Sequence, residues 1–510
     1  MNRARSTFIL IQFLHICVLG MLLGPMSSGV LVASGLVNIC SYGAILIAEL
    51  KRTPAGFSPI LGYYIASFLR LGIAPLWISA VYSHGDYSEL KLGEFSLHNV
   101  MLFGQFLLVV GDWILISAYA LFDRKGGVNF ALTNQAHTRE SRSNLKAIAV
   151  LLSIGWSLKI ADIMGFSFVR SSVVPSLLAT VLPPTAVYLL LVHGDSVVRS
   201  QRMGWRIVAF ILTIIDVVLG MRSYMKSGVL IAVLPAFLYG FSRMRNEWSP
   251  GHTQLLARRF LPIATGVLVI GLVLFPFNQI RRTRGLDLDS TENQLFIDIM
   301  SALEAAVPGT RQFERMHRFP RSGFWGLIGR HAIGISASWS YQYVTQDSHL
   351  KGELIWDEIV SLIPRPLWKD KPTYSPGHKI TVLLGMASTK EEATTATDAG
   401  SMAGGLFLNF GWIGVLVGMI ANGFLLAVAS KLGLKTMKTN PAAAALCMML
   451  YIQALKHYES ATGGNISMYA VAFGLFLPAI ILWERVIPSI RKPVSSGLSM
   501  TQRLGATSKQ

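Results

Sequence analysis

Three arginine residues fall within four positions in the stretch Phe277-Asn-Gln-Ile-Arg-Arg-Thr-Arg-Gly285. The planar guanidinium group binds phosphate oxygens through two parallel hydrogen bonds, and it stabilises a phosphate that leaves with negative charge. We therefore predict that Arg281, Arg282 and Arg284 contact a diphosphate. The simpler alternative is that these side chains anchor an apolar segment at a membrane surface.

Arg222 and Lys226 form a second group of cations, in the turn Met221-Arg-Ser-Tyr-Met-Lys-Ser-Gly228 between two apolar segments. Their charges favour the same role, binding of phosphate oxygens on a substrate. Anchoring at a membrane surface is again the simpler alternative.

A third group lies in the stretch Leu362-Ile-Pro-Arg-Pro-Leu-Trp-Lys-Asp-Lys-Pro372. Its prolines restrict the backbone to extended or turning conformations. The stretch thus presents one aromatic and three basic side chains on a stiff segment: Trp368, Arg365, Lys369 and Lys371. Aromatic faces suit sugar rings and cations suit phosphates, so we predict contact with a sugar phosphate. A proline-rich surface turn is the alternative.

Three residues are candidates for a catalytic base. Asp398 is the only acid in the glycine- and threonine-rich stretch 394–405, where it serves either as a base or as a helix N-cap. His331 and His378 are the other candidates, although a lone histidine more often has a structural hydrogen-bonding role. The sequence leaves the choice open.

Other kinds of chemistry have little support. Asp287-Leu-Asp289 has the spacing of a divalent-metal motif, but the pattern is short and frequent by chance. The cysteines Cys17, Cys40 and Cys447 fall inside apolar segments. Nucleophile-elbow, zincin and nucleotide-binding loop motifs are absent from the sequence. We predict no metal and no other cofactor.

The composition defines the class of protein that must position these residues. Of 510 residues, 52% are hydrophobic and 14% are charged, and the mean hydropathy is +0.49. A soluble globule normally has a charged share of about a quarter. We therefore predict an all-α integral membrane protein. Its net charge of +18 suits the orientation of membrane loops and does not imply a nucleic-acid partner.

Apolar runs long enough to cross a bilayer, about 20 residues each, recur along the chain. They predict about twelve transmembrane helices, near 7–24, 29–50, 58–82, 99–122, 145–163, 172–192, 207–221, 227–242, 260–277, 402–429, 441–457 and 468–486. Basic and non-basic loops alternate between them, which places both termini in the cytoplasm. We interpret the first apolar run as a signal anchor that is not cleaved.

The sequence between 278 and 400 is too long for a simple connection and mixes aromatic residues with charges of both signs. Loop charges assign it to the outer side, and apolar stretches at 324–337 and 353–363 predict amphipathic helices there. The expected organisation is therefore a bundle of about nine helices at 1–277, a large extracytoplasmic loop at 278–400, three further helices at 401–486 and a basic cytoplasmic tail at 487–510.

Two motifs together resemble a known family. Arg-Pro-Leu-Trp-Lys-Asp-Lys-Pro at 365–372 and Leu-Asn-Phe-Gly-Trp-Ile-Gly at 408–414 are similar to the oligosaccharide repeat-unit polymerases of the Wzy type, the O-antigen polymerases. The turn at 221–228 is also similar to a recurrent feature of the wider polymerase and O-antigen ligase superfamily. The motif agreement covers about 220–285 and 360–415, and elsewhere only the topology agrees.

The resemblance implies a glycosyltransferase of the bacterial cytoplasmic membrane that needs no metal. It would move a growing glycan from its undecaprenyl-diphosphate carrier onto the next lipid-linked repeat unit, building O-antigen, capsule or exopolysaccharide. Carried over by position, the diphosphate and sugar contacts would be Arg222, Arg281, Arg284 and Arg365. Membrane lipids and a polysaccharide chain-length regulator are the other expected partners.

Two alternatives remain open at this point. An O-antigen ligase shares the bundle and the long late outer loop, and only the 365–372 motif favours the polymerase. A flippase or other transporter for lipid-linked oligosaccharides also fits the number of spans. Transporters place ionisable residues within the membrane, and Asp112, Lys159, Asp162 and Asp216 are the candidates here.

Overall fold

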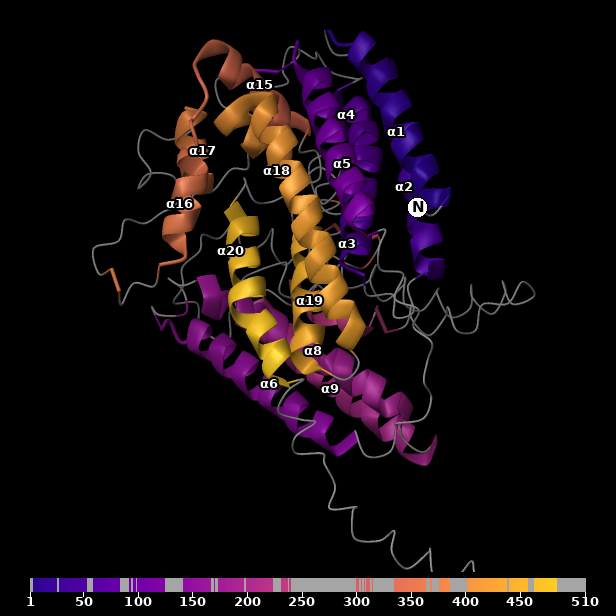
Figure 1. The fold of residues 1–510 in the computed structure, drawn as a ribbon, viewed down its shortest axis with the longest axis vertical. Coiled ribbons are helices and arrows are strands. Elements are labelled where there is room, and N and C mark those ends of the chain that lie inside the picture. Colours follow the sequence, from indigo (N-terminus) through magenta and orange to yellow (C-terminus); the bar gives the residue numbers. More distant parts are fainter. Residues whose placement is uncertain are drawn as a thin grey trace, which may run out of the picture.

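The computed structural model describes residues 3–24, 27–52, 58–82, 91–92, 95–97, 99–123, 141–166, 169, 173–196, 199–222, 231–236, 238–239, 300–301, 304, 307, 309–311, 314, 334–363, 367–368, 376–385, 401–437, 440–456 and 463–483. Almost all of them lie in helices (Figure 1). The first part of the chain forms α1 (Arg3–Met21), α2 (Ser28–Arg52), α3 (Pro59–Ser67), the π-helix η1 (Phe68–Ile73), α4 (Ala74–Tyr82), α5 (Met101–Asp123), α6 (Ser141–Ile163), α8 (Val173–Ser196) and α9 (Arg199–Arg222).

The later part of the described chain is also helical. It forms α15 (Gly334–Gln346), α16 (Glu353–Ser361), α17 (Pro376–Leu383), α18 (Ser401–Thr436), α19 (Pro441–Lys456), α20 (Gly463–Val471) and the π-helix η3 (Ala472–Phe476). Two strands of two residues, β1 (Lys91–Leu92) and β2 (Phe95–Ser96), pair antiparallel.

Seven described helical segments are long and apolar enough to cross a membrane. They begin at Arg3, Ser28, Pro59, Met101, Val174, Gln201 and Ser401. The chain is therefore an α-helical, multi-pass membrane protein, as the composition predicts. Residues 441–455 and 468–483 form shorter apolar helices, whereas the expected span at 260–277 lies outside the described residues.

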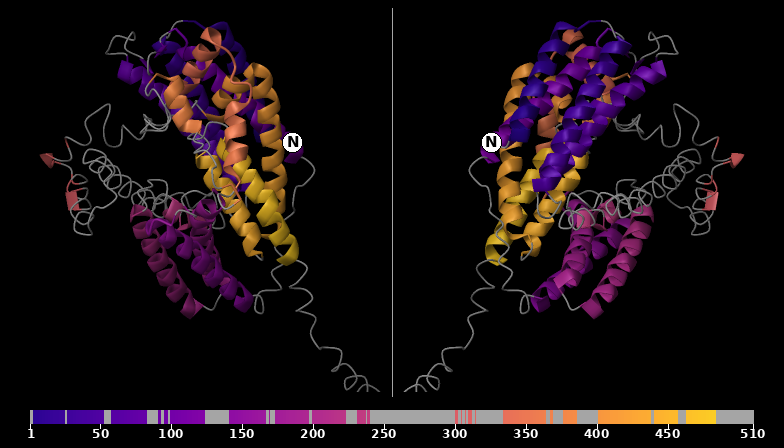
Figure 2. Two further views of the ribbon diagram at one scale, coloured as in Figure 1. Left: turned by 90° about the vertical axis from the view of Figure 1, so that its left-hand side faces the viewer. Right: turned by 90° about the vertical axis from the view of Figure 1, so that its right-hand side faces the viewer.

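The helices form two groups. One group is a bundle that contains α1, α2, α5, α18, α19 and the crossing made by α3, η1 and α4. The second group contains α6, α8 and α9 (Figure 2). The two groups contact each other mainly where α8 packs against α19. Small residues allow close approach: a Cβ added at Gly111 would lie 2.6 Å from the Cβ of Ala403. Such contacts are typical of helices that associate in a membrane.

Pro75 shapes the third crossing. Because proline has no N–H, the carbonyl of Leu71, four residues earlier, loses its α-helical donor. The backbone adopts the π-helical turn η1 just before the proline. The Leu71 carbonyl accepts hydrogen bonds from the side-chain amides of Asn38 in α2, at 3.1 Å, and Gln105 in α5, at 3.4 Å. The carbonyl that the proline leaves without a helical donor thus binds two neighbouring helices to this crossing.

A buried ion pair lies beside this turn. Arg70 Nη2 donates to Asp112 Oδ1 at 2.7 Å, and both residues are at most 2% exposed. The Asp112 carboxylate also accepts hydrogen bonds from Tyr63 at 2.5 Å, Ser67 at 2.6 Å and Tyr42 at 3.3 Å. Four donors therefore compensate the desolvation of one carboxylate, as a charge inside a membrane bundle requires.

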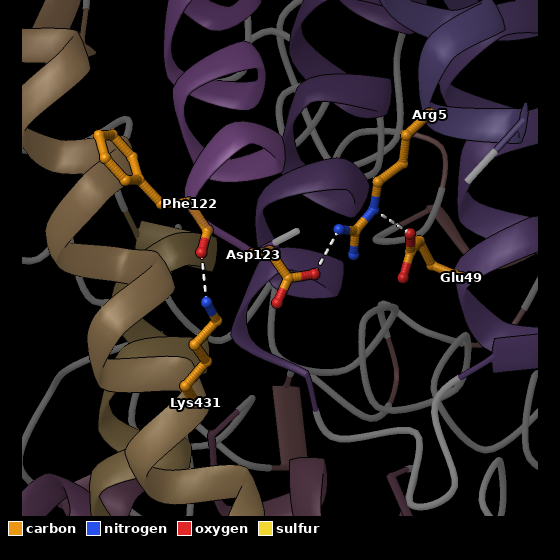
Figure 3. Close-up of polar contacts among 5 residues, drawn as sticks. All are labelled: Arg5, Glu49, Phe122, Asp123 and Lys431. Carbon is orange, nitrogen blue, oxygen red and sulfur yellow. Dashed lines mark hydrogen bonds and ion pairs between the residues drawn. The ribbon is translucent and has the colours of Figure 1, made fainter. Parts of the chain in front are cut away.

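A second charged cluster closes one end of the bundle (Figure 3). Arg5 donates to Glu49 and to Asp123, both at 2.5 Å, and so joins α1 to α2 and α5. Next to it, Lys431 of α18 donates to the carbonyl of Phe122 in the last turn of α5, where a cation is favoured by the helix dipole. Four helices are therefore tied together at this end.

Replacing Arg5 tests how far the bundle depends on this cluster. Arg5→Ala leaves two carboxylates without their common partner, so we expect a loss of about 3–5 kcal/mol in the free energy of unfolding. Arg3→Ala is the matched control, because Arg3 is exposed in the same helical turn. Thermal unfolding of the purified protein in detergent measures both. Equal melting temperatures for the two variants would contradict a structural role of the Arg5 cluster.

Candidate functional site

The segment predicted as one span at 402–429 contains a sharp break. Gly411 has φ 64° and ψ −152°, a combination that only glycine adopts readily, and it separates a short helix at 401–410 from the long remainder of α18. A Cβ at Gly411 would also lie 2.7 Å from Nε2 of His349. Gly411 in the 408–414 motif is therefore required by its backbone conformation, and an added Cβ would also displace the exposed His349 ring.

The break leaves the last carbonyl groups of the short helix without helical donors. Residues that precede α16 supply them: Leu350 N–H donates to the carbonyl of Leu408, and Lys351 N–H to that of Asn409, both at 3.0 Å. The 408–414 motif thus binds the backbone of the segment that leads into the 365–372 motif.

Asn409 completes this junction from its side chain. Its Oδ1 accepts a hydrogen bond from the N–H of Leu354 in the first turn of α16, at 3.3 Å, and its Nδ2 donates to the carbonyl of Gly405, at 2.7 Å. Asn409 is 0% exposed. The side chain therefore acts as an N-cap for a helix 55 residues away in sequence.

The 365–372 motif lies in the connection between α16 and α17. Lys379 of α17 forms an ion pair with Glu353 of α16 and lies 3.9 Å from Asp357. This pairing holds α16 and α17, the two helices that flank the motif in the sequence, against each other.

Helix α15 anchors this part of the chain to the bundle, at the Met101 end of α5. Gly334 and Ser338 pack against Gly104 of α5 so closely that a Cβ at Gly104 would overlap them. The ring of Tyr341 stacks on Phe103, with centroids 3.5 Å apart. The loop charges predict that this end of α5 faces outside, and the same rule assigns 278–400 to the outer side.

Titratable groups gather just before α16. Tyr343 is partly buried, and this burial, together with the charges of Asp347 and Glu353, raises the pKa of its hydroxyl. The hydroxyl is therefore a hydrogen-bond donor at neutral pH. His349 is exposed, and its ring centroid lies 6.4 Å from that of Phe407. These side chains could bind and orient polar groups of a substrate.

Only three of the predicted site residues belong to the described chain. Arg222 is the last residue of α9, His378 lies in the first turn of α17, and Trp368 is 38% exposed after the end of α16. The others lie outside the described residues: Lys226, Arg281, Arg282, Arg284, His331, Arg365, Lys369, Lys371 and Asp398. Their contacts stay predictions.

Two polar residues that are central to the structure have no role in the sequence predictions. They are Asn409, within the 408–414 motif, and Arg70, the partner of Asp112. The sequence does indicate the role of Arg70, because Arg70, Pro75 and Asp112 all occur inside apolar runs. Buried charges in such runs require partners.

Comparison of the chain with protein-family models, with curated proteins and with solved structures finds no match.

Asn409→Leu tests the junction between the 408–414 motif and the start of α16. Loss of the side-chain cap should weaken the start of α16 by about 0.5–2 kcal/mol. Amide hydrogen exchange at residues 350–356 should therefore become several-fold faster. Asn422→Leu is the control, since the Asn422 side chain in the same helix donates to the carbonyl of Gly418 one turn away, outside the junction. Unchanged exchange at 350–356 in Asn409→Leu would rule out the capping role.

Gly411→Ala tests the break in α18. The added Cβ meets His349 and forces a strained backbone, so we expect a cost of about 1–3 kcal/mol and a lower melting temperature. Gly204→Ala, in the open face of α9, adds a Cβ with nothing within 4 Å and should not lower it. The double variant Gly411→Ala/His349→Ala should recover only part of the loss, because the backbone strain remains. A full recovery would show that crowding alone requires glycine.

Proposed function

We propose that this protein is a membrane glycosyltransferase that polymerises undecaprenyl-diphosphate-linked oligosaccharide repeat units into a surface polysaccharide. The observation that supports the proposal is the junction of Leu350, Lys351 and Leu354 with Leu408 and Asn409. It joins the 408–414 motif to the start of α16, the helix that precedes the 365–372 motif in the sequence, and these two motifs carry the resemblance to Wzy-type polymerases. A shared site would explain why both motifs occur in one chain.

In this proposal the reaction takes place at the outer boundary of the bacterial cytoplasmic membrane. About twelve spans place both termini in the cytoplasm, and the 278–400 loop covers the outer end of the bundle. The packing of α15 against the Met101 end of α5 supports this arrangement. A polysaccharide chain-length regulator is the proposed protein partner.

The proposed chemistry is transfer of the glycan from a diphosphate leaving group to a sugar hydroxyl. Arg281, Arg284 and Arg365 would stabilise the charge that develops on the diphosphate. The substrate contacts would come from Arg222, Lys226, Arg282, Trp368, Lys369 and Lys371. A base must take the proton of the attacking hydroxyl, and His378 and Asp398 are the proposed candidates.

Glycan size profiles test the proposal. Deletion of the gene should leave a single lipid-linked repeat unit and no long chains. Arg281→Ala, Arg284→Ala and Arg365→Ala should each abolish polymer at normal protein levels, because the leaving group loses a charge partner. Lys435→Ala, in the last turn of α18, should keep the wild-type profile. Polymer at wild-type levels in all three arginine variants would refute the diphosphate site.

The same profiles separate the alternatives. Long chains that stay on the polyprenyl carrier would indicate a ligase, and repeat units held on the cytoplasmic side would indicate a flippase. One observation favours the transporter alternative, namely the Arg70–Asp112 pair buried within the spans. The four donors to Asp112 instead suit a fixed structural pair.

Variants of this pair distinguish the two roles. If the pair is structural, Asp112→Leu should lower the free energy of unfolding by about 3–5 kcal/mol, and Arg70→Met/Asp112→Leu should restore much of that loss. The double variant should then retain long glycan chains. A double variant that folds with wild-type stability yet traps repeat units inside the cell would instead support transport through this pair.

A further inference from the structure

Polar side chains follow the interface of α1, α2, α3, η1 and α5 along most of its length. On α2 alone, the buried polar residues of this interface are Ser34, Asn38, Ser41, Tyr42 and Glu49. At 1.5 Å per residue they cover about 22 Å of a hydrocarbon layer that is about 30 Å thick. We call the whole set the polar seam, which consists of Arg5, Gln12, His15, Ser34, Asn38, Ser41, Tyr42, Glu49, Tyr63, Tyr64, Ser67, Arg70, Gln105, Asp112 and Asp123.

Helix packing does not require so many polar groups. Helices in a membrane associate through close contacts of small residues, and the helices of the seam have such contacts. A Cβ added at Gly35 of α2 would lie 2.8 Å from the carbonyl oxygen of Gly72 in η1. Ionisable groups inside a bilayer are costly, and they usually mark a path for ions or protons. The charged pair Arg70–Asp112 lies midway along η1 and α5, so the seam has ionisable groups both at its Arg5 end and at its centre.

His15 has the hydrogen-bonding geometry of a proton relay. Its Nδ1 lies 3.5 Å from Oε1 of Gln12, an oxygen that only accepts hydrogen bonds. The Gln12 amide is held in this orientation because its Nε2 donates to Asn38 at 3.1 Å and to Ser41 at 2.6 Å. On the other side of the ring, Nε2 lies 3.1 Å from the hydroxyl of Ser34, which both donates and accepts. Each ring nitrogen therefore has an oxygen partner in the neutral and in the protonated state.

Asp112 is the carboxylate at the centre of the seam. Three of its four donors are the hydroxyls of Tyr42, Tyr63 and Ser67, and a hydroxyl can reverse its direction when the carboxylate takes a proton. Protonation forms an O–H bond on Asp112 and releases the Arg70 guanidinium from the ion pair. Departure of the same proton restores the pair. The charge left on Arg70 opposes a second proton, so protons pass one at a time.

Tyr64 lies between Asp112 and the Arg5 cluster, which is formed by Arg5, Glu49 and Asp123. The Tyr64 ring centroid is 6.5 Å from that of Tyr42 and 6.1 Å from that of Phe8. Its hydroxyl is fully buried and has no hydrogen-bond partner in the part of the chain that the structure describes. The charges of the Arg5 cluster act on this hydroxyl. Buried polar groups of this kind usually bind an ordered water, which can link the two charged groups of the seam.

We propose that the polar seam transfers protons across the membrane, between its Ser34 end and the Arg5 cluster, by way of His15, Asp112 and Tyr64. This activity goes beyond the proposed function and is independent of it. Each transfer breaks and remakes the Arg70–Asp112 pair, which joins the helices of the bundle between transfers. The seam thereby couples a proton gradient to the packing of these helices.

Proton flux into proteoliposomes tests the proposal. The full-length protein is reconstituted with a pH-sensitive dye inside the liposomes, and valinomycin with a potassium gradient sets the membrane potential. We expect the dye to respond about tenfold faster than in protein-free liposomes, because a continuous polar path removes most of the cost of moving a charge through hydrocarbon.

Tyr64→Phe is the sharpest variant, because it removes a hydroxyl that makes no described hydrogen bond and keeps the ring. A purely structural seam predicts unchanged flux and an equal or higher melting temperature. The proton path instead predicts a flux that is about fivefold lower or less, since one exchangeable hydroxyl is lost. His15→Leu should lower the flux in the same way. Tyr469→Phe is the matched control, because the Tyr469 hydroxyl bonds the carbonyl of Asn422 outside the seam, and it should keep the wild-type flux.

Two results would overturn the proposal. Flux no faster than in protein-free liposomes would show that the seam only joins helices. Unchanged flux in both Tyr64→Phe and His15→Leu would place the proton path elsewhere in the protein. The liposomes contain no glycan, so the measurement does not depend on polymerisation. A protein that transfers protons but leaves glycan profiles unchanged on deletion would refute the proposed function alone.

Discussion

The carboxylate of Asp112 imposes the strongest constraint on the helical bundle. A charge in an apolar interior is tolerated only with full compensation, and here it comes from Arg70, Tyr63, Ser67 and Tyr42. These donors belong to α2, α3 and η1, so one carboxylate of α5 determines the positions of all three elements relative to α5. The π-helical turn before Pro75 lies in this same region. Packing of α2, α3, η1 and α5 thus follows from satisfying one acid and one carbonyl group.

The second part of the structure depends on hydrogen bonds between two segments that are distant in the sequence. The short helix at 401–410 ends at Gly411, and two of its last carbonyl groups accept hydrogen bonds from Leu350 and Lys351, which precede α16. In return, Asn409 caps α16. Neither helix end is complete without the other. This mutual dependence explains in physical terms why a buried asparagine and a glycine occur two positions apart, at 409 and 411, in a largely apolar stretch.

The seven described segments that are long and apolar enough to cross a membrane could be predicted from the sequence, because crossing a bilayer depends on length and apolarity, which are local properties. Helix α16 was likewise expected from the apolar stretch at 353–363. The break at Gly411 could not be predicted, since the run 402–429 is continuously apolar and the break is determined by contact with 349–354. The roles of Asn409 and Arg70 depend on partners that are 55 and 42 residues away, and no local pattern reports such pairs. The basic residues 281–284 remain known from the sequence alone.

The Arg5 cluster has a consequence for the way the protein is made. Synthesis proceeds from the N-terminus, so Arg5 and Glu49 enter the membrane long before Asp123 has been translated. During that interval Arg5 has only one of its two acidic partners, and its positive charge can direct the orientation of the first helix. Once α5 arrives, two carboxylates neutralise the same guanidinium. The same side chain is therefore paired with one acid while the first crossings form, and it becomes a doubly paired joint only when the fourth crossing is complete.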